Sequence, residues 1–89
     1  MAHRATERFW LAYEALPLEI RARADRQFER LKSNPQHPSL HFKKIGESQR
    51  KEIWSVRVTL DYRALAFKSD GDFVWFWIGD HKTYDAMLH

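Results

Sequence analysis

The chain has 89 residues, a formal net charge of +3 and a sequence pI near 9.5. A chain of this length is expected to form one domain, which we place at residues 1–89. The absence of cysteine excludes disulfides, zinc–thiolate sites and thiol nucleophiles. No apolar run approaches the roughly 18–20 residues that cross a bilayer, and no hydrophobic signal region follows the charged N-terminus. We therefore expect a cytoplasmic protein that does not contact a membrane.

Two helices are predicted in the first part of the chain. Thr6 is a suitable N-cap for the first helix, whose apolar residues recur at helical spacing. These residues are Phe9, Trp10, Tyr13 and Leu16. Pro17 ends the first helix and suits the first turn of the second, which is predicted at residues 18–33. Its apolar stripe is formed by Ile20, Ala24, Phe28 and Leu31.

The remaining surface of the second predicted helix is basic. Such a surface is typical of a solvated helix face. Contact with nucleic acid or with an acidic segment of a partner protein stays open at this point.

Four strands are predicted after the helices. They span residues 40–43, 53–59, 62–68 and 73–78. The polar segment from Gly46 to Lys51 is predicted to be an exposed turn, and Asp70-Gly71 indicates a tight hairpin because both residues accept a positive φ. The last strand is apolar on both faces, so we expect it to be central in the sheet or covered by the helices.

This order of elements predicts an α+β fold with two N-terminal helices packed on one face of a small antiparallel β-sheet. Gly79-Asp80-His81 is expected to end the last strand, and residues 83–88 to form a short C-terminal helix. A further strand before Thr6 is possible, although the segment is short.

Eight polar residues are predicted to project from the sheet or from its ends. They are His41, Lys43, Lys44, Arg57, Asp61, Arg63, His81 and Tyr84. Histidine transfers protons near neutral pH, and arginine binds phosphate bidentately. This set is poorly suited to metal or glycoside chemistry. It suits cleavage of a phosphodiester, and in RNA the 2′-hydroxyl supplies the nucleophile.

Each of these residues also has a purely structural interpretation. His81 could be a loop or helix-capping residue, and Tyr84 could pack against Trp75 or Trp77. Arg57 and Arg63 could form ion pairs with Asp61 or Asp80. His41 and Lys43 could be solvated residues on an outward strand face. The residues alone therefore indicate a possible phosphodiester site without establishing one.

Short motifs follow one another in a fixed order along nearly the whole chain. They are the segment 34–40 leading into Phe42-Lys43-Lys44, then Trp54-Ser55-Val56-Arg57-Val58, Asp61-Tyr62-Arg63-Ala64-Leu65, Trp77-Ile78-Gly79-Asp80-His81 and Tyr84-Asp85. In this order they resemble the RelE/ParE superfamily, the toxins of bacterial and archaeal type II toxin–antitoxin pairs. The resemblance implies two N-terminal helices on a small curved antiparallel sheet. It also implies either mRNA cleavage in the ribosomal A site, as in most of the RelE branch, or poisoning of DNA gyrase, as in the ParE branch.

The resemblance implies catalytic roles for Arg57, Asp61, Arg63, His81 and Tyr84. Arg57 and Arg63 would hold the scissile phosphate, and His81 would act as general acid or base. Asp61 would fix an arginine or His81, and Tyr84 would orient the substrate. The RNA-binding residues would be His41, Lys43 and Lys44.

Two features depart from the family pattern. Few residues precede Thr6, so the strand at that sheet edge could be short or missing, and Ser55 stands where a lysine could be. Since Arg57, Arg63 and His81 are present, we favour the RelE/YafQ-like branch. The expected function is a ribosome-dependent, metal-independent endoribonuclease without a cofactor, whose partners are a cognate antitoxin, mRNA and the ribosome. The alternatives are a ParE-like inhibitor that binds DNA gyrase and a non-catalytic partner-binding module.

Overall fold

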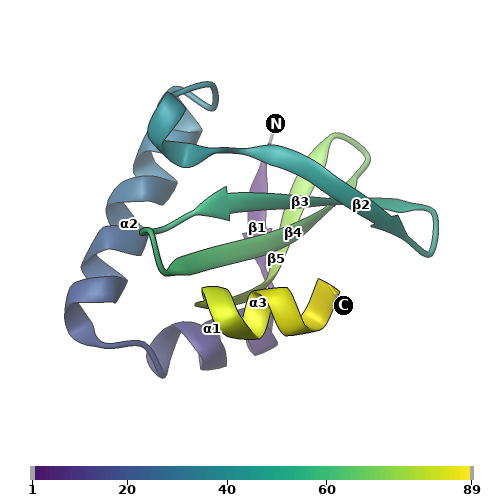
Figure 1. Ribbon diagram of the computed structural model, residues 1–89. Coiled ribbons are helices and arrows are strands. Elements are labelled where there is room, and N and C mark those ends of the chain that lie inside the picture. Colours follow the sequence, from purple (N-terminus) through teal and green to yellow (C-terminus); the bar gives the residue numbers. More distant parts are fainter. Residues whose placement is uncertain (1, 89) are drawn as a thin grey trace.

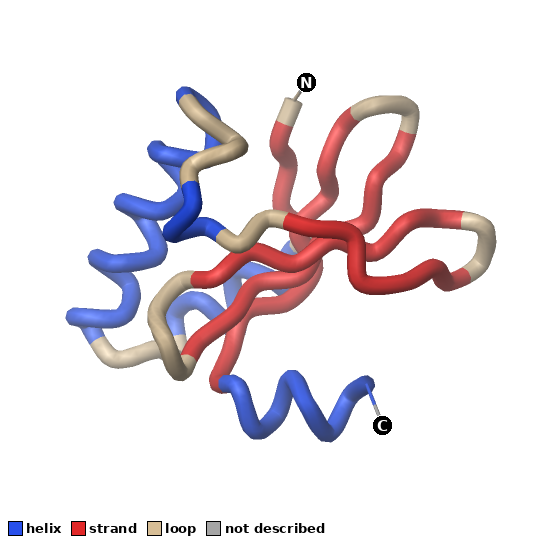
Figure 2. The backbone as a smooth tube through the Cα atoms, turned by 45° about the horizontal axis from the view of Figure 1, so that its top comes forward, coloured by secondary structure: helices blue, strands red, loops and turns tan. Residues whose placement is uncertain are grey.

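A computed structural model describes residues 2–88 of the chain. Its elements are β1 (His3–Ala5), α1 (Glu7–Glu14), α2 (Leu18–Ser33), the 3-10 helix η1 (Pro38–Leu40), β2 (Lys43–Ser48), β3 (Lys51–Arg57), β4 (Tyr62–Ser69), β5 (Asp72–Asp80) and α3 (His81–Leu88). The fold is α+β, as the sequence predicts (Figure 1). Figures 1 and 2 both place α3 away from α2, beside the C-terminal end of β5.

The sheet has the strand order β1-β5-β4-β3-β2. Strands β2 to β5 are antiparallel neighbours, and β5 lies between β1 and β4 as its apolar sequence predicts. The possible strand before Thr6 is present as β1, with only three residues. It pairs parallel to β5, with His3 opposite Phe73 and Ala5 opposite Trp75, so the sheet is mixed rather than purely antiparallel.

The two N-terminal helices form as predicted. Oγ1 of Thr6 accepts a hydrogen bond from the N–H of Phe9 (3.2 Å), and Pro17 precedes the first residue of α2. Helices and sheet bury a common core: Phe9, Leu16, Ala24, Leu31, Leu40, Val56, Val58, Ala64, Ala66, Phe73, Trp75 and Ile78. Trp10 is half exposed, so the predicted apolar face of α1 is narrower than its sequence suggests.

The strand predicted at residues 40–43 is wrong. Pro38 opens η1, where the ring Nδ1 of His37 accepts a hydrogen bond from the N–H of Ser39 (3.2 Å). Leu40 is buried within η1, and His41 follows with a φ of 45°, which interrupts any extended run. Strand β2 begins at Lys43.

The exposed turn predicted from Gly46 to Lys51 is also wrong in its extent. Residues 46–48 belong to β2, and the turn consists of Gln49 and Arg50, both with positive φ. Strand β2 is the outer strand of the sheet and is mostly exposed, so burial imposes no apolar alternation on its sequence. The hairpin predicted at Asp70-Gly71 is confirmed, with φ values of 53° and 85°.

The predicted break at Gly79-Asp80-His81 and the predicted start of the last helix need correction. Gly79 and Asp80 continue β5, and α3 begins at His81 rather than at Thr83. The carboxylate of Asp80 explains this start, because its Oδ1 accepts a hydrogen bond from the N–H of Thr83 (2.7 Å) and caps the helix. No helix among residues 2–88 is long and apolar enough to span a membrane.

Candidate functional site

Arg57 and Arg63 are direct partners in the β3–β4 ladder. Their neighbours Val56 and Ala64 are also partners and are buried in the core. Because successive side chains alternate between the two faces of a sheet, Arg57 and Arg63 project from the face opposite to that core. The register thus places two guanidinium groups side by side on the face that α1 and α2 do not cover.

A histidine and a lysine lie near this pair. The charge of Arg57 lowers the pKa of His41 below its ordinary value, with smaller contributions from desolvation, Lys43 and Arg63. Lys43 is the partner of Ser55 in the β2–β3 ladder, on the same face as Arg57 by alternation. Lys43, Arg57 and Arg63 therefore form one cationic surface, with the His41 ring beside it; we call these four residues the cationic sheet face.

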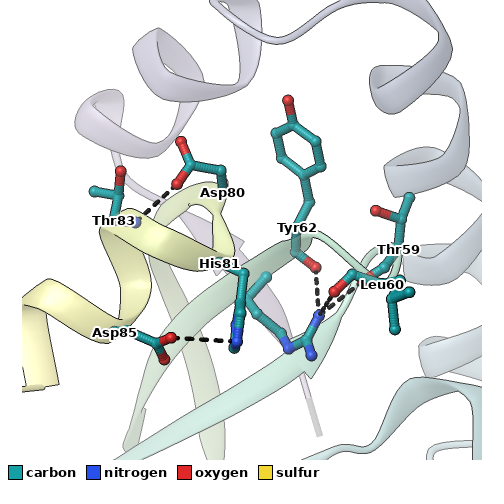
Figure 3. A network of polar contacts seen from close by, with 8 residues as sticks. Thr59, Leu60, Tyr62, Asp80, His81, Thr83 and Asp85 are labelled. Atoms are coloured by element: carbon teal, nitrogen blue, oxygen red, sulfur yellow. Dashed lines mark hydrogen bonds and ion pairs between the residues drawn. The ribbon is translucent and has the colours of Figure 1, made fainter.

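Arg63 is held by the loop that connects β3 and β4. Its Nη1 donates hydrogen bonds to three carbonyl oxygens, those of Thr59 (2.7 Å), Leu60 (3.2 Å) and Tyr62 (3.1 Å) (Figure 3). Burial and the charge of Arg57 lower its pKa. The side chain therefore fixes the loop with one nitrogen and presents its charge beside Arg57.

The first turn of α3 lies against the same loop. The backbone N–H of His81 donates a hydrogen bond to the carbonyl oxygen of Asp61. The ring Nε2 of His81 lies 3.2 Å from Oδ2 of Asp85 (Figure 3). The same ring stacks on Tyr84 with centroids 5.9 Å apart. Tyr84 and Asp85 also interact electrostatically with Arg63. Both raise the pKa of Arg63 and so partly offset the effect of burial and of Arg57.

Most of the residues predicted for the site are thus brought together, but two are not placed as expected. Asp61 is exposed and contributes its backbone carbonyl, whereas its carboxylate has no hydrogen bond or ion pair within residues 2–88. Lys44 lies opposite Trp54 and pairs with Glu47 on the edge strand (2.7 Å), so it faces away from Lys43. In the described part of the chain neither Arg57 nor Arg63 forms an ion pair with a carboxylate, which argues against the structural pairing with Asp61 or Asp80.

Gln27 is a supporting residue that the sequence interpretation missed. It is 7% exposed, and its Nε2 donates hydrogen bonds to the carbonyl oxygens of Arg57 (2.8 Å) and Ser39 (3.3 Å). It thereby fixes the end of β3 against α2. The sequence pattern could have indicated this role. Gln27 falls on the apolar stripe of α2 between Ala24 and Leu31, and a polar side chain buried there needs a hydrogen-bond partner.

Trp77 is a second residue near the site that was missed. A Cβ at Gly79 would lie 2.5 Å from Cζ2 of Trp77, so the indole ring covers this glycine. Gly79 is the partner of Arg63, which places the ring on the face that carries Arg63. Tyr84, for which packing against Trp75 or Trp77 was an alternative, stacks on His81 instead.

Solved structures of a toxin and of two antitoxin–toxin complexes have a similar fold. The RelB–RelE antitoxin–toxin complex from Methanococcus jannaschii matches with a TM-score of 0.72 and 17% identity over 97% of this chain and 99% of the other. The archaeal RelE–RelB complex from Pyrococcus horikoshii OT3 gives a TM-score of 0.68 and 15% identity over 89% and 92%. The YoeB/ParE toxin from Agrobacterium tumefaciens gives 0.68 and 16% over 91% and 99%. A comparison with curated protein sequences gives no match.

These similarities define the fold as that of the RelE/ParE-superfamily toxins. The family follows from the sequence itself, because the model of the ParE-like toxin domain matches residues 18–86. The chain therefore belongs to the family of ParE-like toxin domains. The superfamily predicted from the ordered motifs is confirmed.

Proposed function

We propose that this chain is the toxin of a type II toxin–antitoxin system and acts as a metal-independent endoribonuclease on mRNA bound to the ribosome. The observation that carries the proposal is the position of His81 and Tyr84 beside the cationic sheet face. A proton-transfer residue next to cationic groups without carboxylate partners is an arrangement that supports metal-independent phosphodiester cleavage.

In the proposed reaction the 2′-hydroxyl oxygen attacks the adjacent phosphorus. The new P–O2′ bond gives a 2′,3′-cyclic phosphate, and the P–O5′ bond breaks. A base takes the proton of the 2′-hydroxyl, and an acid delivers a proton to the leaving 5′-oxygen. His81 performs one of these two transfers. Since Nε2 of His81 faces Asp85, its Nδ1 is the nitrogen available to the substrate.

The two arginines have different roles in this mechanism. Arg57 offsets the negative charge that develops on the phosphate oxygens, because its guanidinium has no carboxylate partner among the described residues. Nη1 of Arg63 is already engaged by three backbone carbonyls. Arg63 therefore orders the β3–β4 loop and adds positive charge beside Arg57. Tyr84 orients the substrate next to His81.

A cognate antitoxin is the proposed partner in the cell. Two of the similar structures are complexes with RelB antitoxins. We infer that an antitoxin encoded beside this chain neutralises it, and that mRNA and the ribosome are its targets once the antitoxin is removed.

Inhibition of DNA gyrase is the second candidate, because the matching family model has a ParE-like description. The two candidates differ in their target and in their need for proton transfer. Purified chain should be added to a reconstituted translation reaction with a reporter mRNA, and in parallel to gyrase with relaxed plasmid. The proposal predicts new mRNA 5′ ends only when ribosomes are translating, and normal supercoiling. Intact mRNA with blocked supercoiling would support the gyrase candidate instead.

A further inference from the structure

A pocket of about 480 Å³ lies between α2 and the β3–β4 loop, next to the candidate site. Four of the residues that line it are arginines: Arg23, Arg26 and Arg30 from α2, and Arg57 from β3. None of the described residues that line it is acidic. We call this feature the arginine pocket. Its volume lies in the range of ligand sites, about 300–1,000 Å³.

The arginines of the pocket are not neutralised by neighbouring carboxylates. No ion pair joins any of the four to an acid within residues 2–88. Arg23, Arg26 and Arg30 follow one another at spacings of three and four residues, where like charges on a helix repel. A bound anion would remove this repulsion.

One arginine of the pocket is held in place by hydrogen bonds. Nη1 of Arg30 donates hydrogen bonds to Oε1 of Gln27 (3.0 Å) and to Oγ of Ser39 (3.0 Å). Arg57 contributes a fourth positive charge to the lining, and no carboxylate within residues 2–88 forms an ion pair with its guanidinium.

The walls of the pocket favour phosphate over a protein segment. An amphipathic helix or a peptide anchor needs an apolar groove, whereas the apolar contribution here is limited to Val58 and Leu60. Guanidinium groups bind phosphate oxygens bidentately. Thr59 is a further polar residue in the lining.

Arg57 belongs to the arginine pocket and also to the cationic sheet face, where its charge acts on His41. Positive groups therefore continue from the α2 side, through Arg57, to the proposed catalytic residues. A nucleic-acid strand carries one phosphate on every nucleotide, so successive phosphates of one strand fit such a row of positive groups. We propose that the arginine pocket binds a backbone phosphate of the same RNA strand whose neighbouring phosphate lies at the cationic sheet face. This inference rests on the proposed function, since it assigns a second phosphate-binding site to the same substrate.

The test measures binding without cleavage. A fluorescent 2′-O-methyl RNA hexamer lacks the nucleophilic hydroxyl and cannot be cut. Its affinity for the full chain is measured by anisotropy over a range of salt concentrations. The test variant is Arg23→Gln with Arg26→Gln, and the matched control is Arg8→Gln with Arg50→Gln, which removes the same charge from exposed positions outside the pocket. Equal thermal unfolding midpoints establish that both variants fold.

The test variant should bind the hexamer about tenfold or more weakly than the control, the effect of losing one charge-assisted hydrogen bond. The slope of its salt dependence should also fall by about 0.7 for each phosphate that the variant no longer neutralises. Pyrophosphate should compete with the hexamer in the parent chain, and a hexaglutamate peptide should compete much less. Equally weakened binding in both double variants, unchanged binding in the test variant, or equally strong competition by hexaglutamate would overturn the proposal.

The result is independent of the nuclease assay. If the chain bound the hexamer through the pocket but cut no mRNA, the phosphate site would be supported and the proposed nuclease activity would be rejected. If the test variant cut mRNA and bound the hexamer as well as the parent chain, the nuclease activity would be supported and the phosphate site would be rejected.

Discussion

The backbone N–H of His81 donates a hydrogen bond to the carbonyl oxygen of Asp61, and this bond joins the start of α3 to the β3–β4 loop. The loop is also fixed by Arg63, whose Nη1 contacts two of its carbonyl oxygens, those of Thr59 and Leu60, and that of Tyr62 at the start of β4. As a result, His81 and Tyr84 from the end of the chain lie near Arg63, which is itself the strand partner of Arg57.

Replacing Gln27 should destabilise the protein. In Gln27→Leu the carbonyl oxygens of Arg57 and Ser39 lose their buried donor, and Arg30 loses an acceptor. The cost of leaving buried polar groups unpaired is about 1–3 kcal/mol. Urea unfolding should show a lower midpoint with an unchanged slope. The exposed residue Gln36 serves as control, and Gln36→Leu should stay within about 0.5 kcal/mol of the parent.

The ring of Trp77 should make Gly79 intolerant of a side chain. In Gly79→Ala the new Cβ would lie 2.5 Å from Cζ2 of Trp77, so the indole must move. Overpacking of this kind costs about 1–3 kcal/mol, measured as a drop in the free energy of unfolding together with a change in tryptophan fluorescence. Gly46→Ala is the control, because a Cβ there has no atom within 4 Å. Equal stability of both variants would show that the ring does not cover Gly79.

His41 should titrate below the ordinary histidine pKa of about 6.5. The largest cause of the lowered pKa is the charge of Arg57. Arg57→Gln should therefore raise the pKa of His41, and Lys43→Gln should raise it less. The ring proton shifts of His41 in an NMR pH titration report both values. If Arg57→Gln left the pKa of His41 unchanged, His41 would not lie close to Arg57 and would not belong to the cationic sheet face.

The capping carboxylate of Asp80 should make the stability of α3 depend on pH. Hydrogen bonding to the N–H of Thr83 lowers the pKa of Asp80 in the folded protein. Its contribution is therefore complete above the unfolded pKa, about 3.9, and is lost as the pH falls through the lower folded pKa. Hydrogen exchange of the α3 amides should be faster in Asp80→Ala than in the parent at pH 7. If the difference persisted unchanged at pH 2, the charge of Asp80 would not be its source.

The helices, the three inner strands and the hairpin at Asp70-Gly71 could be predicted from the sequence because burial and turn chemistry impose recognisable patterns on them. Strand β2 could not, since it is an outer strand with mostly exposed residues and has no apolar alternation. The boundary between β5 and α3 was missed for a different reason. Asp80 is both the last residue of the strand and the cap of the helix, whereas the pair Gly79-Asp80 is typical of a turn.

The candidate site was predictable as a set of residue types but not as a set of contacts. The partnership of Arg57 with Arg63 follows from the strand register, and the role of Asp61 follows from a backbone carbonyl rather than from its side chain. The engagement of Arg63 by two loop carbonyls and by that of Tyr62 depends on the conformation of the loop. These interactions depend on how strands and loops are arranged in space, so no local sequence pattern reports them.

The central claim is that His81 transfers a proton during mRNA cleavage. The most direct measurement is the single-round rate of mRNA cleavage on purified, saturating ribosomes by the parent chain, by His81→Ala and by Lys82→Ala, which alters an exposed neighbour on the same helix. Loss of general acid–base catalysis should slow His81→Ala by about 10²–10⁴-fold, whereas Lys82→Ala should cut within a few-fold of the parent. Cleavage by His81→Ala at the rate of the parent would contradict the claim.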